Sequence, residues 1–167
     1  MGVSHSVIDS PLGELTLVSA ESGALAAVYF DEHKRRPDAD TFGPRDASAF
    51  GAVTEQLGEY FAGTRTTFDL QLAPTGNDFQ LRVWALLREI PFGETRSYGQ
   101  LALELGDRNL SQAVGAANGK NPISIIVPCH RVVGAHGSLV GYAGGLDRKR
   151  FLLTHEEPAE ASLERLF

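Results

Sequence analysis

Cys129 is the only cysteine of this 167-residue chain, and the residues around it indicate nucleophilic chemistry. Residues 125–131 read IIVPCHR, so an apolar run enters a proline directly before the thiol. A thiol reacts as its thiolate, and positive charge beside the sulfur lowers the pKa of the thiol. His130 and Arg131 can supply that charge, and we therefore predict that Cys129 is a reactive thiol.

The alternative is that Cys129 is a small buried apolar side chain, which is the common role of a lone cysteine. Neighbouring side chains diverge in an extended segment, so adjacency alone does not give a hydrogen bond between Cys129 and His130. A water can carry the proton between them. The spacing favours a thiol activated by His130 and leaves the geometry of the activation open.

Residues 121–133 (NPISIIVPCHRVV) resemble the active-site signature of the O6-alkylguanine-DNA alkyltransferases, also called methylated-DNA–protein-cysteine methyltransferases. Four further matches follow in the order of the family. They are Phe79-Gln80 with Val83-Trp84, residues 93–98 (GETRSY), residues 141–145 (GYAGG) and residues 152–156 (LLTHE). The resemblance is dense over residues 76–156 and loose before them.

The resemblance implies a DNA repair reaction that consumes the protein. The Cys129 thiolate would displace guanine from an alkyl carbon attached to O6, leaving a thioether on the protein; O4-alkylthymine is a second expected substrate. His130 would act through water as the base for Cys129, with Glu156 orienting His130. The Tyr98 hydroxyl would assist the leaving guanine, and Asn121 would be the hinge between recognition helix and active site. A thioether has no easy route back to a thiol, so each molecule is expected to act once.

The resemblance also implies which residues contact DNA. The target atom lies inside the duplex, so the nucleotide must be flipped out. Small residues on the second helix of a helix-turn-helix would permit close approach in the minor groove, whereas a reader of major-groove base edges needs several exposed Arg, Asn or Gln residues. A tightly packed interior helix explains these small residues equally well. The expected contacts are Ser111, Gln112, Ala113, Gly115 and Ala116 on that helix, and Val127, Arg131, Val140, Gly141, Tyr142, Ala143 and Gly144 at the base pocket.

Two positions depart from the family pattern. Gln112 stands where the family usually has an arginine that fills the gap left by the flipped base, and Ala143 stands where some relatives have serine. Glutamine lacks the charge and the planar stacking surface of arginine. We therefore predict weaker, more salt-sensitive or slower base flipping than in relatives with arginine.

The expected fold is α+β, with a small N-terminal α/β domain (residues 1–75) and a mainly helical C-terminal domain (residues 76–167). In the first domain, periodicity and turn signals predict an antiparallel sheet and one helix. The predicted elements are strands near residues 7–8, 15–17, 24–30 and 68–72, a loop over 31–46 and a helix over 50–61. In the second domain, apolar spacing and capping residues predict helices and a winged-helix-like helix-turn-helix. These helices are expected from Asp78 to Ile90, from Ser97 to Leu105, from Asn109 or Ser111 to about Gly119, and from Asp147 to Glu156, with a turn of about four residues in the helix-turn-helix.

The net charge of −6 taken alone argues against DNA as a partner, because phosphate binding usually shows as a basic footprint. The charge is unevenly distributed. Residues 1–75 carry 5 basic and 11 acidic side chains, residues 76–155 carry 9 and 6, and residues 156–167 carry 1 and 4. The segment with the helix-turn-helix is therefore basic, and double-stranded DNA remains the expected partner.

Composition excludes several other classes of protein. The 43% hydrophobic and 22% charged residues are ordinary globular usage, and one cysteine allows neither an internal disulfide nor a multi-thiolate zinc site. We expect no metal, no cofactor and none of the phosphotriester repair that some relatives perform with a metal-binding domain. Without a secretory pattern or an apolar run longer than seven residues, we expect a monomeric cytoplasmic protein with no membrane partner.

Two other functions stay open at this point. A non-catalytic protein could flip alkylated bases and mark them for other repair proteins, although relatives of that kind lack the nucleophilic cysteine. A cysteine hydrolase would need an oxyanion site and turnover, for which the sequence carries no separate signal.

Overall fold

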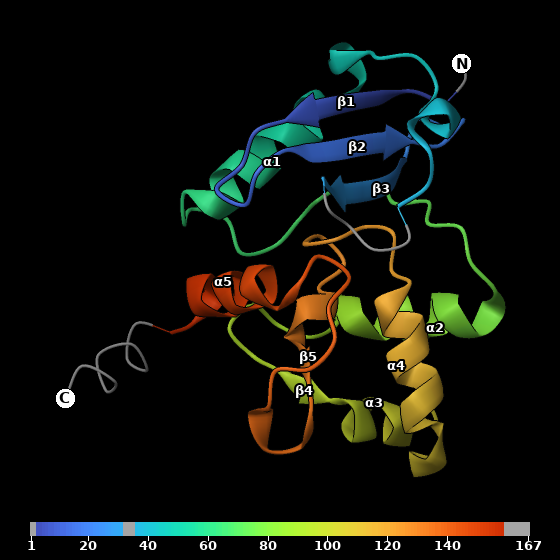
Figure 1. Cartoon of the computed structure of the whole chain (residues 1–167), viewed down its shortest axis with the longest axis vertical. Helices are drawn as coiled ribbons and strands as arrows, with labels where there is room; N and C mark the ends of the chain where they lie inside the picture. Colours follow the sequence, from blue (N-terminus) through green and yellow to red (C-terminus); the bar gives the residue numbers. More distant parts are fainter. Residues whose placement is uncertain (1–2, 32–35, 159–167) are drawn as a thin grey trace.

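The computed structural model describes residues 3–31 and 36–158, and it shows a small sheet followed by a mainly helical part (Figure 1). Three antiparallel strands form the sheet in the order β1–β2–β3. They are β1 (His5–Ile8), β2 (Leu15–Ser19) and β3 (Leu25–Phe30), followed by the helix α1 (Gly51–Phe61). The α+β fold class is confirmed, and these three strands and α1 overlap the segments predicted for them.

Both faces of β2 are covered, because its alternating side chains contact two different hydrophobic clusters. Leu15 and Leu17 point into the main core with the buried side chains of α1. Val18 points the other way, into a smaller cluster with Ala27 and Phe42. Because successive side chains of a strand face opposite sides and both faces of β2 are covered, its polar residues Thr16 and Ser19 are buried as well, each 4% exposed. The loop expected over residues 31–46 contains the short 3₁₀ helix η1 (Ala39–Phe42), and its residues 32–35 lie outside the described part.

The prediction of a strand near residues 68–72 is wrong. Leu72 makes one isolated bridge to Leu25, and the segment forms no ladder. Phe68, Leu70 and Leu72 are partly buried against the main core. Their alternation reflects an extended segment lying along apolar side chains, which produces the same period of two as a strand.

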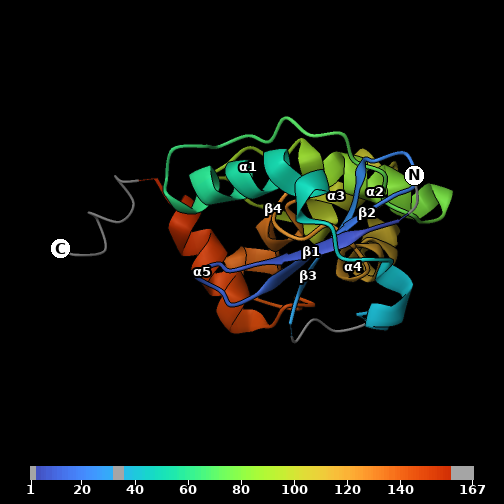
Figure 2. The ribbon, with the colours of Figure 1, turned by 90° about the horizontal axis from the view of Figure 1, so that it is seen from above.

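The described residues of the second part form four α-helices and a two-stranded parallel sheet. Its elements are α2 (Asp78–Arg88), β4 (Arg96–Ser97), α3 (Tyr98–Glu104), α4 (Ser111–Gly119), β5 (Val132–Val133) and α5 (Leu146–Glu156). Asn77, not Asp78, caps α2 through a capping box with Gln80. Ser97 caps α3 as expected, with Gln100 completing the box. In both Figure 1 and Figure 2, α5 lies on one side of this part, and α2 with α4 lies on the other.

Helices α3 and α4 form the helix-turn-helix. Residues 105–110 connect them and contain the 3₁₀ helix η3 (Arg108–Leu110), so the connection is longer than the four residues predicted. Gly106 adopts a φ of 108°, which ends α3 in a conformation that favours glycine. No helix in the described residues is long and apolar enough to cross a membrane.

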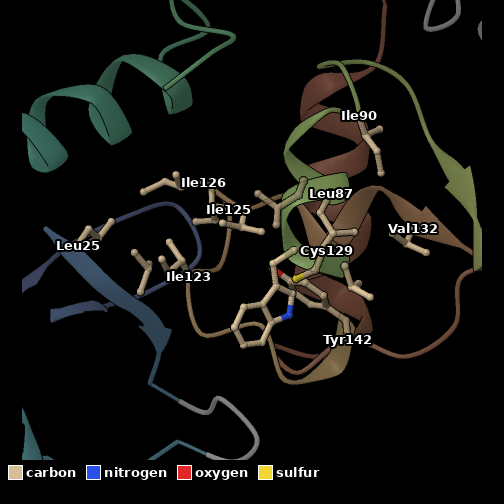
Figure 3. Packing of buried hydrophobic residues seen from close by; sticks show 14 of the residues in the cluster. Leu25, Leu87, Ile90, Ile123, Ile125, Ile126, Cys129, Val132 and Tyr142 are labelled. Carbon is tan, nitrogen blue, oxygen red and sulfur yellow. The ribbon is translucent and has the colours of Figure 1, made fainter. Parts of the chain in front are cut away.

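One hydrophobic core joins the two parts and holds the segment that carries Cys129. Val28 of β3 donates its N–H to the Pro122 carbonyl (2.9 Å) and accepts from the Ser124 N–H (3.3 Å). On the other side, Trp84 of α2 donates its indole N–H to the Ala117 carbonyl of α4 (2.8 Å). Figure 3 shows Ile123 beside Leu25 of β3, and Cys129 among the side chains around Leu87 and Tyr142. Both parts of the chain therefore position the cysteine.

Candidate active site

Cys129 opens the 3₁₀ helix η4 (Cys129–Arg131) and is only 5% exposed. The chain before it is tightly wound: the Val127 N–H donates to the Ile123 carbonyl (3.1 Å), and the Cys129 N–H donates to the Val127 carbonyl (2.8 Å). Ile125 has a φ of 72°, which is strained for a β-branched residue. The surrounding hydrogen bonds hold this strained loop and fix the sulfur.

Asn121 pins the two ends of the same loop. Its side-chain Nδ2 donates to the Val127 carbonyl (2.9 Å), and its Oδ1 accepts from the Ile123 N–H (3.0 Å). Asn121, the predicted hinge residue, is therefore buried just after α4, and its two hydrogen bonds stabilise the loop that carries Cys129. Val127 is itself buried, with its carbonyl accepting from Asn121 and Cys129.

Burial raises the pKa of the Cys129 thiol overall, and the side chain of Asn121 and the positive charge of Lys149 offset part of this rise. The sequence interpretation gave the role of the cation to His130 and Arg131. Burial lowers the pKa of His130, which favours the neutral ring, and the Arg131 guanidinium is bound elsewhere. Lys149 on α5 is the cation that favours the thiolate.

His130 and Glu156 form a buried pair. His130 Nε2 lies 2.7 Å from Glu156 Oε2, and His130 is 0% and Glu156 2% exposed. Burial raises the pKa of Glu156, but the hydrogen bonds from His130 and Arg131, together with the positive charge of Arg131, outweigh burial and lower it to about 2. An ionised carboxylate only accepts, so the ring proton sits on Nε2. His130 Nδ1 then keeps a lone pair, and it has no hydrogen-bond partner among the described residues.

Arg131 was predicted to contact substrate or DNA, and the structure places it inside the protein instead. It is 6% exposed; its Nε donates to Glu156 Oε1 (2.7 Å) and its Nη2 donates to Oε2 (3.0 Å). Its Nη1 donates to the Ile90 carbonyl (2.7 Å). This bidentate ion pair between Arg131 and Glu156 fixes the plane of the carboxylate. Arg131 therefore anchors Glu156.

A pocket of about 240 Å³ brings together side chains from three segments. Tyr98 opens α3, and its hydroxyl donates to the Val140 carbonyl (3.4 Å). Burial and the charge of Cys129 raise the pKa of Tyr98, so its hydroxyl stays protonated at neutral pH. The pocket is lined by Tyr98, Gly115, Asn118, Gly119, Gly141, Tyr142 and Ala143. Five of the predicted pocket and helix residues therefore meet in one place.

Gly144 and Val140 were predicted at the base pocket, but neither is among the residues that line it. A Cβ on Gly144 would lie 2.5 Å from the Phe30 ring, so Gly144 allows β3 to approach and does not line the pocket. Val140 exposes 41% of its surface, and its carbonyl accepts from Tyr98 and Lys149.

Helix α4 presents its small residues to the surface. Gln112, Ala113 and Ala116 are exposed, Ser111 and Gly115 are half-buried, and Val114 with Ala117 faces the core. The interior-helix alternative is therefore wrong. The exposed face carries no acidic side chain between residues 111 and 119. This face lies next to the pocket, to which Gly115 contributes.

Sequence reasoning missed three polar residues of this site. Lys149 is 0% exposed and donates to the carbonyls of Val132 (2.6 Å), Val140 (2.7 Å) and Gly141 (3.2 Å), tying the glycine-rich segment to β5. Asn118 is 4% exposed, lines the pocket and donates to the Cys129 carbonyl (3.4 Å). Tyr60 of α1 donates its hydroxyl to Glu156 Oε2 (2.6 Å).

A buried cysteine beside a neutral histidine–carboxylate pair, attached to a helix-turn-helix, defines a class of DNA-binding protein with a nucleophilic thiol. The chain belongs to the 6-O-methylguanine DNA methyltransferase family. Residues 78–158 match its DNA-binding domain, and residues 3–74 match its ribonuclease-like domain.

Similar proteins cover nearly the whole chain. The methylated-DNA–protein-cysteine methyltransferase of Mycobacterium tuberculosis is 48% identical, over 96% of this chain and 98% of its own length. The protein of the same name from Methanosarcina acetivorans is 47% identical, over 91% and 97%. The crystal structure of Mycobacterium tuberculosis OGT in complex with DNA superposes with a TM-score of 0.86 at 48% identity, over 96% of this chain and 98% of that chain.

Proposed function

We propose that this protein repairs duplex DNA by moving the alkyl group from O6 of a flipped guanine to Sγ of Cys129, once per molecule. The observation that carries the proposal is the buried Cys129 beside His130, whose Nδ1 lone pair is available because Glu156 holds the proton on Nε2. The family membership and the DNA complex of a similar protein support the substrate class.

The proposed reaction balances as one displacement. His130 takes the thiol proton through water, and the thiolate attacks the alkyl carbon. The new bond is Sγ–C and the broken bond is C–O6, whose electron pair stays with guanine. The guanine takes up one proton in return, with the Tyr98 hydroxyl at the pocket as the proposed donor, and the proton held by His130 passes through water to restore the Tyr98 hydroxyl. The thioether product has no thiolate left, so a second turnover is not expected.

We also propose that the protein works in the cytoplasm and that the chain divides into two domains. A repair protein for DNA with an essential thiol must work where DNA is present and thiols stay reduced, which favours the cytoplasm. We also propose a domain boundary near residues 75–76, supported by the two family domains that end at residue 74 and begin at residue 78.

Weighing the intact protein after incubation with a duplex containing O6-methylguanine tests the proposal. Wild type is expected to gain one methyl group, and Cys129→Ser none. A wild type that binds the duplex without gaining mass would support a non-catalytic reader of alkylated bases. Release of more than one repaired guanine per protein would contradict a single-use acceptor.

A further inference from the structure

Tyr60 links the first part of the chain to the carboxylate of the active site. It lies on α1, is 0% exposed, and its hydroxyl donates to Glu156 Oε2 at 2.6 Å across 96 positions of sequence. The same oxygen accepts from His130 Nε2 (2.7 Å) and Arg131 Nη2 (3.0 Å). Among the described residues, Tyr60 is the only partner of Glu156 that comes from the first part of the chain.

The Tyr60 ring is held in place by other rings. Its centroid lies 5.1 Å from that of Phe61, 5.6 Å from that of Phe68 and 6.1 Å from that of Phe92. The ring centroid of His155, the residue before Glu156, lies 4.9 Å from that of Tyr60. His155 Nε2 also donates a hydrogen bond to the Tyr60 carbonyl (2.7 Å). A ring packed on several sides cannot change rotamer without disturbing its neighbours. The hydroxyl is therefore aimed at Glu156 by the packing of both parts.

We propose that Tyr60 is a positioning residue for the alkyl transfer: by sharing Glu156 Oε2 with His130, it fixes the carboxylate and limits how strongly the carboxylate attracts the imidazole proton. This inference rests on the proposed function. It gives the acidic first part of the chain a direct influence on the chemistry, beyond its contribution to the core.

Tyr60 is suited to this role because it remains a donor. Burial, together with the charge of Glu156, raises the pKa of Tyr60 far above neutrality. His130 is faced by Glu156, by the cations Arg131 and Lys149 and by the Cys129 thiol next to it in the chain. Tyr142 is the other ionisable side chain that interacts with Cys129, Tyr60 and Glu156, and burial raises its pKa, so it is neutral. Apart from His130 itself, Tyr60 is the only neutral group among them that donates to Oε2, because the third donor, Arg131, is a cation.

Removing the Tyr60 hydroxyl is expected to raise the pKa of His130. Oε2 keeps two donors, so more of its charge acts on His130 and the pKa of the imidazole rises. His130 must be neutral to accept the thiol proton, so the loss of rate on acidification should begin at a higher pH. Losing one fixed hydrogen bond to a charged group should also misplace the carboxylate and slow the transfer about tenfold.

Tyr60→Phe tests the inference in single-turnover experiments at saturating duplex with O6-methylguanine, followed by intact-protein mass over a range of pH. The expected result is a rate constant about tenfold lower, an acid limb displaced to higher pH and an unchanged dissociation constant for the duplex. The rate constant is read from the time course, so unfolded protein lowers the amplitude and leaves the rate constant unaffected.

Phe61→Leu is the matched control. It weakens the same aromatic cluster on α1 and keeps the Tyr60 hydroxyl, so it should lower thermal stability and leave the rate and pH profile unchanged. The inference is overturned if Tyr60→Phe behaves like Phe61→Leu. A wild type that gains no methyl group would instead overturn the proposed function, so the two failures are distinguishable.

Discussion

Replacing Glu156 by glutamine is expected to remove a part of the stability that depends on pH. The carboxylate is 2% exposed and accepts hydrogen bonds from Tyr60, His130 and Arg131. Burial alone would raise its pKa, but His130 and Arg131 lower the pKa from 4.5 to about 2. The folded state therefore holds the ionised form much more strongly than the unfolded state does.

The magnitude follows from the difference between the two pKa values. About 2.5 pH units at about 1.36 kcal/mol per unit correspond to roughly 3 kcal/mol of stability. Loss of one partner from a buried ion pair costs about 3–5 kcal/mol, which is the same range. Because the folded pKa is the lower one, the contribution is complete above the unfolded pKa of about 4.5 and is lost as the pH falls towards about 2.

Urea unfolding of wild type and Glu156→Gln over a pH series measures this contribution. The variant should be less stable by roughly 3 kcal/mol near neutral pH, and the two curves should converge as the pH falls below about 4.5. Glu94→Gln is the control, because Glu94 is exposed and, within the described ranges, its carboxylate pairs only with Arg96; it should change stability by less than about 1 kcal/mol. A gap between wild type and Glu156→Gln that stays constant on acidification would refute the assignment of this stability to the Glu156 charge.

Three further substitutions test the site. Gln112→Arg on the exposed face of α4 should raise duplex affinity and transfer rate several-fold, because arginine adds charge and a stacking plane; fluorescence anisotropy and single-turnover rates that both equal wild type would contradict it. Tyr98→Phe should lower the transfer rate about a hundredfold with duplex affinity unchanged, as expected for loss of a proton donor; a loss of affinity alone would mean a binding role. Lys149→Met should raise the pKa of the Cys129 thiol, so that iodoacetamide labelling begins at a higher pH than in wild type; identical labelling curves would exclude Lys149 as the cation.

Local features of the sequence were sufficient for most elements of the fold. Helix caps such as Ser97 with Gln100 act within four residues, and apolar spacing reports which face of α1 or α2 is buried. The segment 68–72 shows the limit of this reasoning, because an extended chain resting on a core has the same alternation as a strand. Only a neighbouring strand distinguishes the two, and that neighbour is a tertiary fact.

Adjacent residues predicted Cys129 and His130 as nucleophile and base, and the family resemblance predicted Glu156, whereas the other polar partners in the site were not predicted. Tyr60 reads as one more apolar position of a helix, since its hydroxyl meets Glu156 only after the two parts pack. Lys149 stands in the charged run DRKR, which is typical of a solvated helix end, yet it is fully buried. Arg131 lies two residues from Cys129 in the chain, and its side chain turns away to Glu156. Where a long side chain ends is set by the buried acceptors it can reach, and the sequence alone does not give their positions.

The net charge of −6 is compatible with DNA binding once the charges are placed on the structure. Residues 1–75 carry the largest acidic excess, and these residues form the sheet and α1. Helix α4 offers a face without acidic side chains between residues 111 and 119, so no carboxylate there repels phosphate. The cations nearest the chemistry, Arg131 and Lys149, are buried and serve Glu156 and the glycine-rich segment. Affinity for DNA must then come from cations that remain exposed, such as Arg108 and Lys120 on either side of α4, so binding is expected to be modest and to weaken as the salt concentration rises.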